Sequence, residues 1–364
     1  MKRSGSLPVE PPTPPGPSKA RKVLVVLLLL LIVGAAGAAG VWFFLGTRVT
    51  DFASEPFGSA QTKVVSIPPG SSPKAVAAIL AKAEVVSDAD LLYAYLRREK
   101  LGPKLRAGEY EFQGPLAPAD VVGRIIKGEV KLYHFTVPEG LRVDEIIPIL
   151  AASDLGLSAE KLAALVKSPA EARKLGIPAD SFEGFLAPDT YSFTRNATEE
   201  AVLKRMVDRT LEMVRQAPRK EGVDFDLLQA VTLASIVEKE TGAAEERPRI
   251  SCVFHNRLRR GIKLMTDPTV LYAKMLRTGS FSKNITKADL LAEHPYNTYT
   301  VKGLPPGPIA SPGQAAIAAA LNPPSCNDLY FVARNDGTSE FCPDLKCHNA
   351  AVQKWQVDYH RKRK

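Results

Sequence analysis

Two glutamates at the end of an apolar segment are the residues of this chain best suited to acid–base chemistry. The run LASIV, residues 233–237, ends abruptly in Glu238, Lys239 and Glu240. On a helix that turns about 100° per residue, Glu238 and Glu240 project about 200° apart, so at most one of them faces a given cleft. A carboxyl group among apolar neighbours has its charged form disfavoured, which raises its pKa and suits a general acid near neutral pH. The alternative is a solvated, salt-bridged helix end, because most glutamates are exposed.

The elements that would hold these carboxylates are mainly helical. Residues 226–239 are apolar on most faces, which is typical of a helix inside a domain. A second helix is expected over residues 248–260, where Gly261 ends it. Loops rich in Pro and Gly follow, and then a strand over residues 329–333 and a helix from about Asn349.

The segment before these helices repeats a local pattern. Strands 64–67 and 134–137 both alternate apolar and polar residues and lead into a Pro-x-Gly turn. After each of them we expect two helices, a short aromatic strand and a further helix, so we interpret this part as two related β-α-α-β-α units. The expected elements are helix 73–82 behind the cap Ser72, a helix from Ser87 with Asp90 as a capping box, strand 110–112 and helix 119–127, and then helix 143–152, a helix from Ser158, strand 191–193 and helix 199–214.

The N-terminal part of the chain predicts a single-pass membrane anchor. Residues 23–45 carry no charge and reach the roughly 20 apolar residues that a spanning helix needs. They are too long for the apolar core of a cleaved signal peptide, which is the alternative. Basic residues cluster before the span, so the positive-inside rule places the N-terminus in the cytoplasm and the rest outside the cell membrane. We expect a disordered cytoplasmic tail at 1–22, the transmembrane helix at 23–45 and a polar linker at 46–61.

The charge of the chain favours an anionic partner. The formal net charge is +9 and the isoelectric point is near 9.3, which is typical of contact with a membrane surface, an acidic polymer or nucleic acid. No zinc-finger, helix-turn-helix or RNA-binding motif accompanies the basic residues, so we expect no nucleic-acid partner. Motifs of nucleotide-binding proteins, metalloproteases and serine hydrolases are also missing, and nothing in the sequence calls for a metal ion or a cofactor.

The pairing of the cysteines stays open at this level. Cys252, Cys326, Cys342 and Cys347 allow three full pairings, and an exported compartment permits disulfides. Cys252 lies in an apolar helical pattern, and we interpret it as a small core residue. Cys342 and Cys347 could ligate zinc together with His348, but their spacing is not that of a standard zinc pair, so a loop disulfide or free thiols are favoured.

Several long motifs resemble those of the YceG-like family of endolytic murein transglycosylases. The resemblance extends over nearly everything after the apolar span, in the family's order. The motifs are LRAGEY at 105–110, EGFLAPDTY at 183–191, ASIVEKET at 234–241, VFHNRLRRGIKLMTDPTVLYA at 253–273, YNTYTVKGLPPGPIASPG at 296–313 and LYFVARNDG at 329–337.

The resemblance implies a membrane-anchored enzyme of α+β fold that cuts nascent peptidoglycan glycan strands internally. It assigns residues 62–130 to a LysM-like β-α-α-β subdomain and residues 131–364 to a larger, mixed α+β catalytic domain. The family's catalytic acid corresponds to the first glutamate of EKET, here Glu238. Glycan strands are the implied substrate, and glycan-polymerising synthases in the same membrane are the implied partners.

The chemistry implied by the resemblance needs only one carboxyl group. That group protonates the glycosidic oxygen between MurNAc and GlcNAc and then accepts the proton of the muramoyl C6 hydroxyl, which closes onto C1 and leaves a 1,6-anhydroMurNAc end. Most glycosidases use a second carboxylate instead. Such cuts would terminate glycan elongation. Two alternatives are a muramidase-type hydrolase with the same site and a non-catalytic envelope protein that binds peptidoglycan through the LysM-like unit.

Four further polar residues of these motifs are candidates for binding sugar or stem peptide: Asn256, Asp267, Asn297 and Tyr299. Each could equally serve the scaffold, Asp267 in a turn and Asn256 as a cap of neighbouring backbone. After the late strand the chain departs from the family pattern, because the usual histidine of a Gly-x-His-x-Phe segment is missing from residues 337–341 and cysteines are present nearby.

Overall fold

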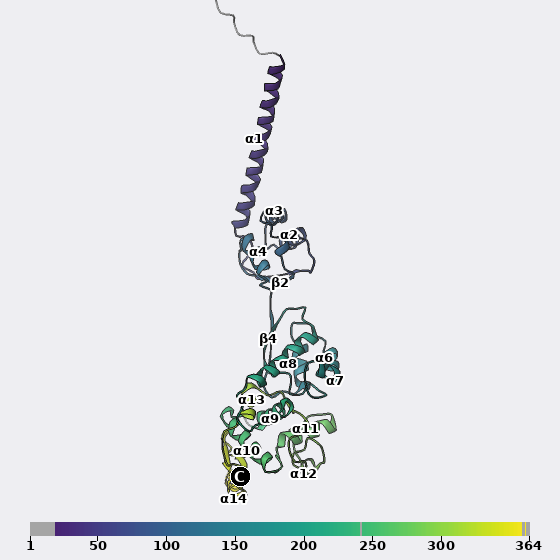
Figure 1. Ribbon diagram of the computed structural model, residues 1–364, viewed down its shortest axis with the longest axis vertical. Helices are drawn as coiled ribbons and strands as arrows, with labels where there is room; N and C mark the ends of the chain where they lie inside the picture. The colour runs from purple at the N-terminus through teal and green to yellow at the C-terminus, as the bar shows by residue number, and fades with distance from the viewer. Residues whose placement is uncertain (1–18, 241, 359–360, 362–364) are drawn as a thin grey trace, which may run out of the picture. The chain divides into compact units, whose positions relative to one another are not determined.

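The structure is a computed structural model that describes residues 19–240, 242–358 and 361. The chain divides into two compact units, Met1–Lys131 and Leu132–Lys364, and each of them combines helices with a pair of strands or more (Figure 1). The expected α+β fold is thereby confirmed. Residues 1–18 of the expected disordered tail lie outside the described residues.

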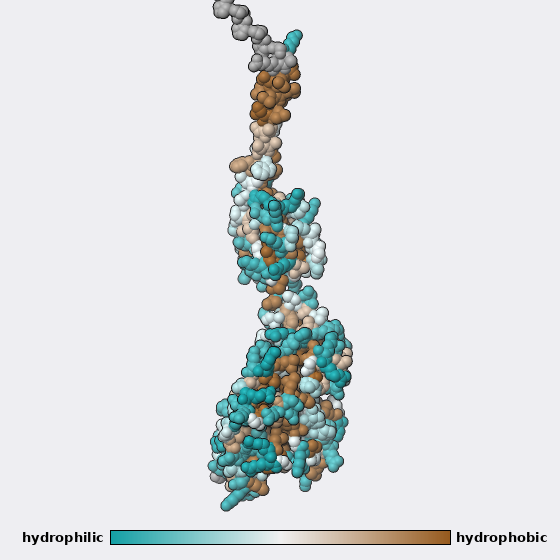
Figure 2. All heavy atoms as spheres, in the orientation of Figure 1, coloured by the Kyte–Doolittle hydropathy of each residue, from teal (hydrophilic) through white to brown (hydrophobic). Residues whose placement is uncertain are grey.

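Helix α1, Lys19–Ser54, contains the apolar span and continues past it. It is a candidate membrane span by length and composition, and Figure 2 shows its upper part in brown, paling toward its lower end. The expected linker at 46–61 is wrong in its first part, because α1 stays helical as far as Ser54. Val49 and Phe52 are buried there, and Phe52 belongs to the core of the first unit, so packing extends the helix beyond the apolar run.

The first unit is built on two antiparallel strands with Val65 opposite Tyr110. Apolar residues that alternate along both strands pack against three helices in one core. The helix α3 is capped by Asp88, which accepts from two backbone N–H groups, and not by the expected Ser87. The β-α-α-β order is as expected, while likeness to LysM remains a prediction. The elements are β1 Lys63–Ile67, α2 Pro73–Lys82, α3 Ala89–Arg98, the 3-10 turn η1 Gly102–Lys104, β2 Gly108–Phe112 and α4 Pro118–Lys127.

The second unit begins with the same plan of elements. Its two strands are antiparallel, with Phe135 opposite Tyr191, and the two rings stack with centroids 5.4 Å apart. A short helix that the sequence did not predict, α7, is inserted between α6 and the second strand. The elements are β3 Tyr133–Val137, α5 Val143–Ala151, α6 Ala159–Val166, α7 Pro169–Lys174, β4 Asp189–Phe193 and α8 Glu199–Gln216.

The rest of the second unit surrounds one central helix, α9, Leu227–Glu240. Every residue of α9 from Ala230 to Glu238 is buried, and α9 packs against α8, α10, α11 and α13. The sequence predicted α9 and α10 but treated the segments of α11, α12 and α13 as loops, because Pro and Gly surround them. The further elements are the 3-10 turn η2 Ala244–Glu246, α10 Arg247–Arg259, α11 Asp267–Thr278, α12 Lys287–Leu291, α13 Gln314–Leu321, β5 Tyr330–Ala333, β6 Ser339–Cys342, α14 Leu345–Val352 and the π-helical turn η3 Gln353–Asp358.

Two disulfides close the second unit, Cys252–Cys326 and Cys342–Cys347. The loop disulfide at Cys342 was one of the two expected outcomes for that pair. Cys252 is buried, as expected of a core residue, and it also bonds Cys326 in the segment that follows α13, a pairing that the sequence left open. Since the Cys342 and Cys347 sulfurs bond each other, they are not available as zinc ligands beside His348.

Candidate active site

The two glutamates at the end of α9 do lie on opposite sides of the helix, and one of them opens onto a cavity. Glu240 lines an open cavity, whereas Glu238 is not among the lining residues of this cavity. The other walls come from α10, the start of α11, the loop before α13 and the β5–α14 segment. Besides Glu240, the lining residues are Phe254, Arg257, Leu264, Met265, Asp267, Tyr299, Tyr330, Phe331, Leu345 and His348.

The environment of Glu240 favours a protonated carboxyl group near neutral pH. Burial raises its pKa to about 7, and the negative charge of Asp267 acts in the same direction. A hydrogen bond from the Thr266 hydroxyl and the positive charge of Arg257 oppose this shift. Glu240 nevertheless remains partly exposed, so its proton is accessible from the cavity. These are the properties that a general acid requires.

Asp267 and Tyr299 form a second polar pair on the cavity wall. The Tyr299 hydroxyl donates a hydrogen bond of 2.7 Å to Oδ1 of Asp267. Burial and this hydrogen bond both raise the pKa of Tyr299, so it stays a neutral donor. Asp267 is the first residue of α11 and is followed by Pro268, whose fixed backbone suits the first turn of a helix.

The far wall of the cavity is held by the Arg257 guanidinium. Its Nε donates to the carbonyl of Leu329 and its Nη1 to that of Leu264, both at 2.6 Å. Arg257 also lies over the ring of Tyr330, 5.0 Å from its centroid, and the His348 ring stacks on the same tyrosine at 5.1 Å. Burial first, and then the charge of Arg257, lower the pKa of His348, so this wall presents a neutral imidazole.

Glu238 has a different environment, in which both carboxylate oxygens have protein partners. Oε1 forms an ion pair of 2.8 Å with Arg247, and Oε2 accepts from the backbone N–H of Gly313 at 3.0 Å. Glu139, from the turn after β3, lies 3.4 Å from the same guanidinium. Burial and the charge of Glu238 raise the pKa of Glu139. The side chain of Glu238 is only 5% exposed, so this cluster ties α9 to two loops of the second unit.

The comparison with known proteins covers most of the chain. The sequence profile of the YceG-like family matches residues 65–354. The chain belongs to the YceG-like family. It is 31% identical over 316 residues to the endolytic murein transglycosylase of Bacillus subtilis, which covers 82% of this chain and 86% of that protein. The enzyme of the same name from Streptococcus pneumoniae strain R6 is 31% identical over 302 residues, 74% of this chain and 54% of its own length.

A solved structure of the YceG-like family supports the fold. The crystal structure of a YceG-like protein from Listeria monocytogenes superposes with a TM-score of 0.52 at 28% sequence identity. It covers 80% of this chain, and 99% of that chain is matched. At this identity the likeness extends to the sequence as well as to the arrangement of elements.

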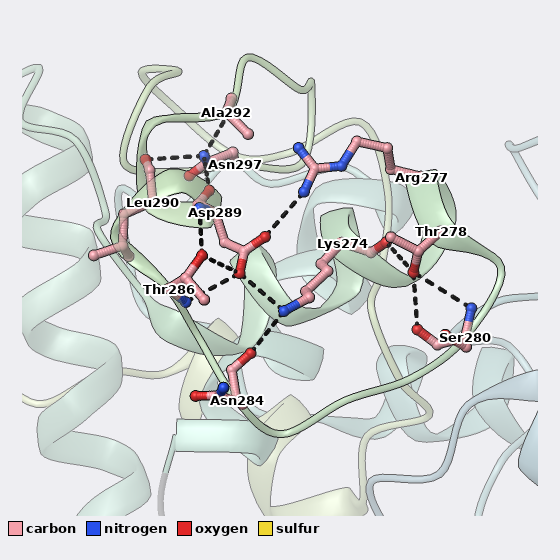
Figure 3. Close-up of polar contacts among 10 residues, drawn as sticks. All are labelled: Lys274, Arg277, Thr278, Ser280, Asn284, Thr286, Asp289, Leu290, Ala292 and Asn297. Atoms are coloured by element: carbon pink, nitrogen blue, oxygen red, sulfur yellow. Dashed lines mark hydrogen bonds and ion pairs between the residues drawn. The ribbon is translucent and has the colours of Figure 1, made fainter.

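Two of the four binding candidates in this YceG-like protein serve the scaffold. Asn256 is buried and donates its amide to the carbonyls of Cys326 and Asp328. Asn297 is 1% exposed and donates to three carbonyls in and after α12, as Figure 3 shows. Neither amide lines the cavity. Asp267 and Tyr299, by contrast, both do.

The network around Asn297 fixes the segment that carries Tyr299. Asp289, at the centre of Figure 3, accepts from Lys274 and Arg277 at 2.9 Å each and from the hydroxyl of Thr286 at 2.8 Å. The hydrogen bond with Lys274 is the main cause of its lowered pKa. Asn297 also accepts from the backbone N–H of Tyr299 at 3.0 Å, so the same side chain binds the backbone that leads into the cavity wall.

Sequence reasoning missed several residues of this site. Thr266 and Arg257 lie within the motif at 253–273 and Tyr330 within that at 329–337, whereas His348 lies outside the quoted motifs. The signal that could have found Thr266, Arg257 and Tyr330 is their position inside long family motifs. Their convergence on Glu240 depends on how α9, α10, α11 and α14 pack together.

Proposed function

We propose that this protein is an endolytic lytic transglycosylase of peptidoglycan, with Glu240 as its acid. The activity is the one named for the relatives that cover most of the chain. The observation that supports Glu240 is its place on the cavity wall, where burial raises its pKa to about 7. The substrate is the glycan strand, whose extended shape suits an open cavity.

Glu240 performs both proton transfers. In the first, its carboxyl group donates a proton to the glycosidic oxygen as the bond from C1 of MurNAc to that oxygen breaks. In the second, the resulting carboxylate takes the proton of the C6 hydroxyl, whose oxygen bonds to C1. The proton count of Glu240 is restored, no water is consumed, and the product ends in 1,6-anhydroMurNAc. A pKa near the working pH serves both the donating and the accepting step.

The remaining groups of the cavity have supporting roles. The negative charge of Asp267 stabilises the positive charge that develops at C1 while the glycosidic bond breaks. Tyr299 holds Asp267 through their hydrogen bond. The rings of Tyr330 and Phe331 offer apolar faces to the sugar rings. Binding the C6 hydroxyl close to C1 is the positioning that lets it outcompete water.

The assignment to Glu238, which the family motif predicted, stays the competing assignment for the acid. Its carboxylate oxygens are both already engaged, one by an arginine and one by a backbone N–H, and its side chain is only 5% exposed. We infer that Glu238 positions the end of α9 rather than reacting.

A pair of substitutions on the same helix separates these assignments. We expect Glu240→Gln to lower the cleavage rate of uncrosslinked glycan strands by about 10²–10⁴-fold, because it removes the proton donor. Glu238→Gln can accept only one of the two hydrogen bonds that Glu238 accepts and loses the ion pair with Arg247, so it should lower stability, but its cleavage rate should stay within about tenfold of the parent. The opposite ranking would assign the acid to Glu238. Mass spectrometry of the fragments identifies the reaction: anhydro ends are lighter by one water than the ends left by a muramidase, and binding without fragments would indicate a non-catalytic envelope protein.

The site of action follows from the N-terminal helix. We propose that α1 spans the cell membrane with its N-terminus in the cytoplasm, so that both units face the nascent wall. Cleavage next to the membrane terminates strand elongation, and the glycan-polymerising synthases are the expected neighbours. Cysteine-scanning with a membrane-impermeant thiol reagent tests this orientation: a cysteine at Ser59 should be labelled from outside in intact cells.

A further inference from the structure

The first unit contains a cavity that the proposed chemistry does not use. It lies between the start of α2, the end of α3 and η1. Three cationic side chains, Lys74, Arg97 and Lys100, line it, and no acidic residue does so in the described part of the chain. Tyr93 adds an aromatic wall, with the Arg97 guanidinium 6.0 Å from its ring centroid.

The positive charge of this cavity is not neutralised by the protein. In the portion of the first unit that the structure describes, the ion pairs involve other cations, namely those of Lys63, Arg98, Lys127 and Lys131. The N-terminus of α2, a helix of ten residues, lies at the same cavity and adds the positive end of its dipole. An anion is therefore the ligand that the cavity would attract.

The backbone shapes this cavity as a fixed feature. Lys100 adopts a left-handed conformation with φ of 54°, which is uncommon for a residue with a side chain. Two residues later, a Cβ atom on Gly102 would lie 2.7 Å from Cγ of Pro73, so only glycine lets η1 approach α2 this closely. The turn after α3 thus holds the lysine and the helix N-terminus together.

The cavity lies close to the level at which α1 leaves the apolar span. Gly46 directly follows the span, and its carbonyl accepts from Nη1 of Arg98 at 3.1 Å, while Thr50 accepts from the same atom at 2.9 Å. Arg98 adjoins Arg97 at the end of α3, which packs beside the lower end of α1 in Figure 1. With a rise of about 1.5 Å per residue, the first turn beyond the span measures about 5 Å, comparable to the headgroup layer of one leaflet.

We propose that this cavity binds the phosphate of an anionic phospholipid headgroup in the outer leaflet. The inference rests on the proposed membrane anchoring and orientation of α1. Basic residues are attracted to anionic lipid surfaces, and this cavity presents three of them at headgroup level, where a phosphate ester is the abundant anion. The bound lipid would hold the first unit against the membrane, close to where new strands emerge.

The test uses the full chain in vesicles, with benzoylphenylalanine in place of Tyr93 as a photo-crosslinker. Vesicles contain phosphatidylcholine with a small, radiolabelled fraction of either phosphatidylglycerol or phosphatidylcholine. We expect at least tenfold more adduct with phosphatidylglycerol, and loss of this preference in the double variant Arg97→Gln/Lys100→Gln. The double variant Lys82→Gln/Lys127→Gln removes the same charge elsewhere on the unit and should keep it. Free glycerol phosphate at millimolar concentration should not compete, because the lipid is concentrated at the surface.

The outcomes separate this inference from the proposed function. Equal adducts with both lipids, or a preference that survives loss of Arg97 and Lys100, would overturn the phosphate site. Competition by free glycerol phosphate would overturn the lipid as the source of the phosphate. Cleavage of glycan strands and resistance of the protein to alkaline extraction are measured on the same vesicles. If the protein is active and integral but shows no lipid preference, only the cavity assignment fails, whereas a protein extracted by alkali contradicts the anchor itself.

Discussion

The hydroxyl of Thr266 donates a hydrogen bond to the carboxylate of Glu240 and so joins the end of α9 to the residue before α11. The backbone of Thr266 is itself fixed, because its N–H donates to the Thr298 hydroxyl at 3.1 Å. This donor favours the charged form of Glu240, while burial favours the neutral form. The balance between the two sets the pH at which the proposed acid loses its proton.

The first prediction concerns the pH dependence of cleavage. With Glu240 as the acid and a pKa of about 7, kcat/KM should fall about tenfold per pH unit above that value. Thr266→Val removes a donor to the carboxylate, so the pKa of Glu240 should rise and the alkaline limb should move to higher pH. Initial rates of strand cleavage by the parent and by the variant, measured between pH 5 and pH 9 at about equal substrate saturation, locate the alkaline limb of each. A limb that stays in place would exclude Thr266 as a partner of the acid.

A second prediction concerns stability. Glu240 has a folded pKa of about 7, above the value of an unfolded glutamate, so the folded state binds the extra proton. Its stabilising contribution is present below about pH 4.5 and is lost as the pH rises to about 7, by about 3 kcal/mol at most. Glu240→Gln removes this loss, so the variant should be more stable than the parent at pH 8 and similar at pH 4.5. Urea unfolding at both values checks the sign.

Glu183 provides a matched control for that experiment. It is buried, with a pKa also raised to about 7 by burial, and it accepts hydrogen bonds from Tyr272 and from the N–H of Val143. Glu183→Gln should therefore stabilise the protein at pH 8 in the same way while leaving cleavage near the parental rate, since this residue does not line the cavity. A loss of activity equal to that of Glu240→Gln would contradict this distinction.

A third prediction separates scaffold from site in the 297–299 segment. Tyr299→Phe deletes only the hydroxyl that holds Asp267, so we expect kcat to fall about tenfold with little change in unfolding temperature. Asn297→Ala leaves three buried carbonyls without their donor and should cost about 2–4 kcal/mol of stability. Thermal unfolding and steady-state kinetics on both variants give opposite patterns if the assignment holds; similar patterns would refute it.

The fourth prediction compares the two disulfides. Cys252 and Cys326 are 74 residues apart, and Cys342 and Cys347 are 5 apart. By loop entropy, Ala substitution of the first pair should cost about 4 kcal/mol and of the second about 2 kcal/mol. The second pair adjoins His348 on the cavity wall, so its loss should raise KM while the first pair acts on stability alone. Unfolding in urea and KM for glycan strands, measured on both double variants, test this; equal effects on KM would contradict it.

The amino-acid sequence by itself determined the features that depend on local periodicity. Helix α2 begins and ends where the apolar spacing and the Ser72 cap predict, because capping and amphipathic spacing act within a few residues. The same reasoning predicted that Glu238 and Glu240 lie on opposite sides of α9, and the contacts of the two residues confirm it. The long motifs also predicted the YceG-like family.

Only the tertiary structure decided that Glu240 lines this cavity. Residues from α10, α11 and α14 line the same cavity as Glu240, and no local pattern encodes such a meeting of distant segments. The pairing of Cys252 with Cys326 was likewise decided by the tertiary structure. So was the scaffold role of Asn297, whose buried amide donates to a backbone carbonyl after α12. Helical continuation through Phe52 likewise depends on a partner surface. Burial and its effect on pKa are properties of neighbours in space, and the packing of whole helices is what supplies those neighbours.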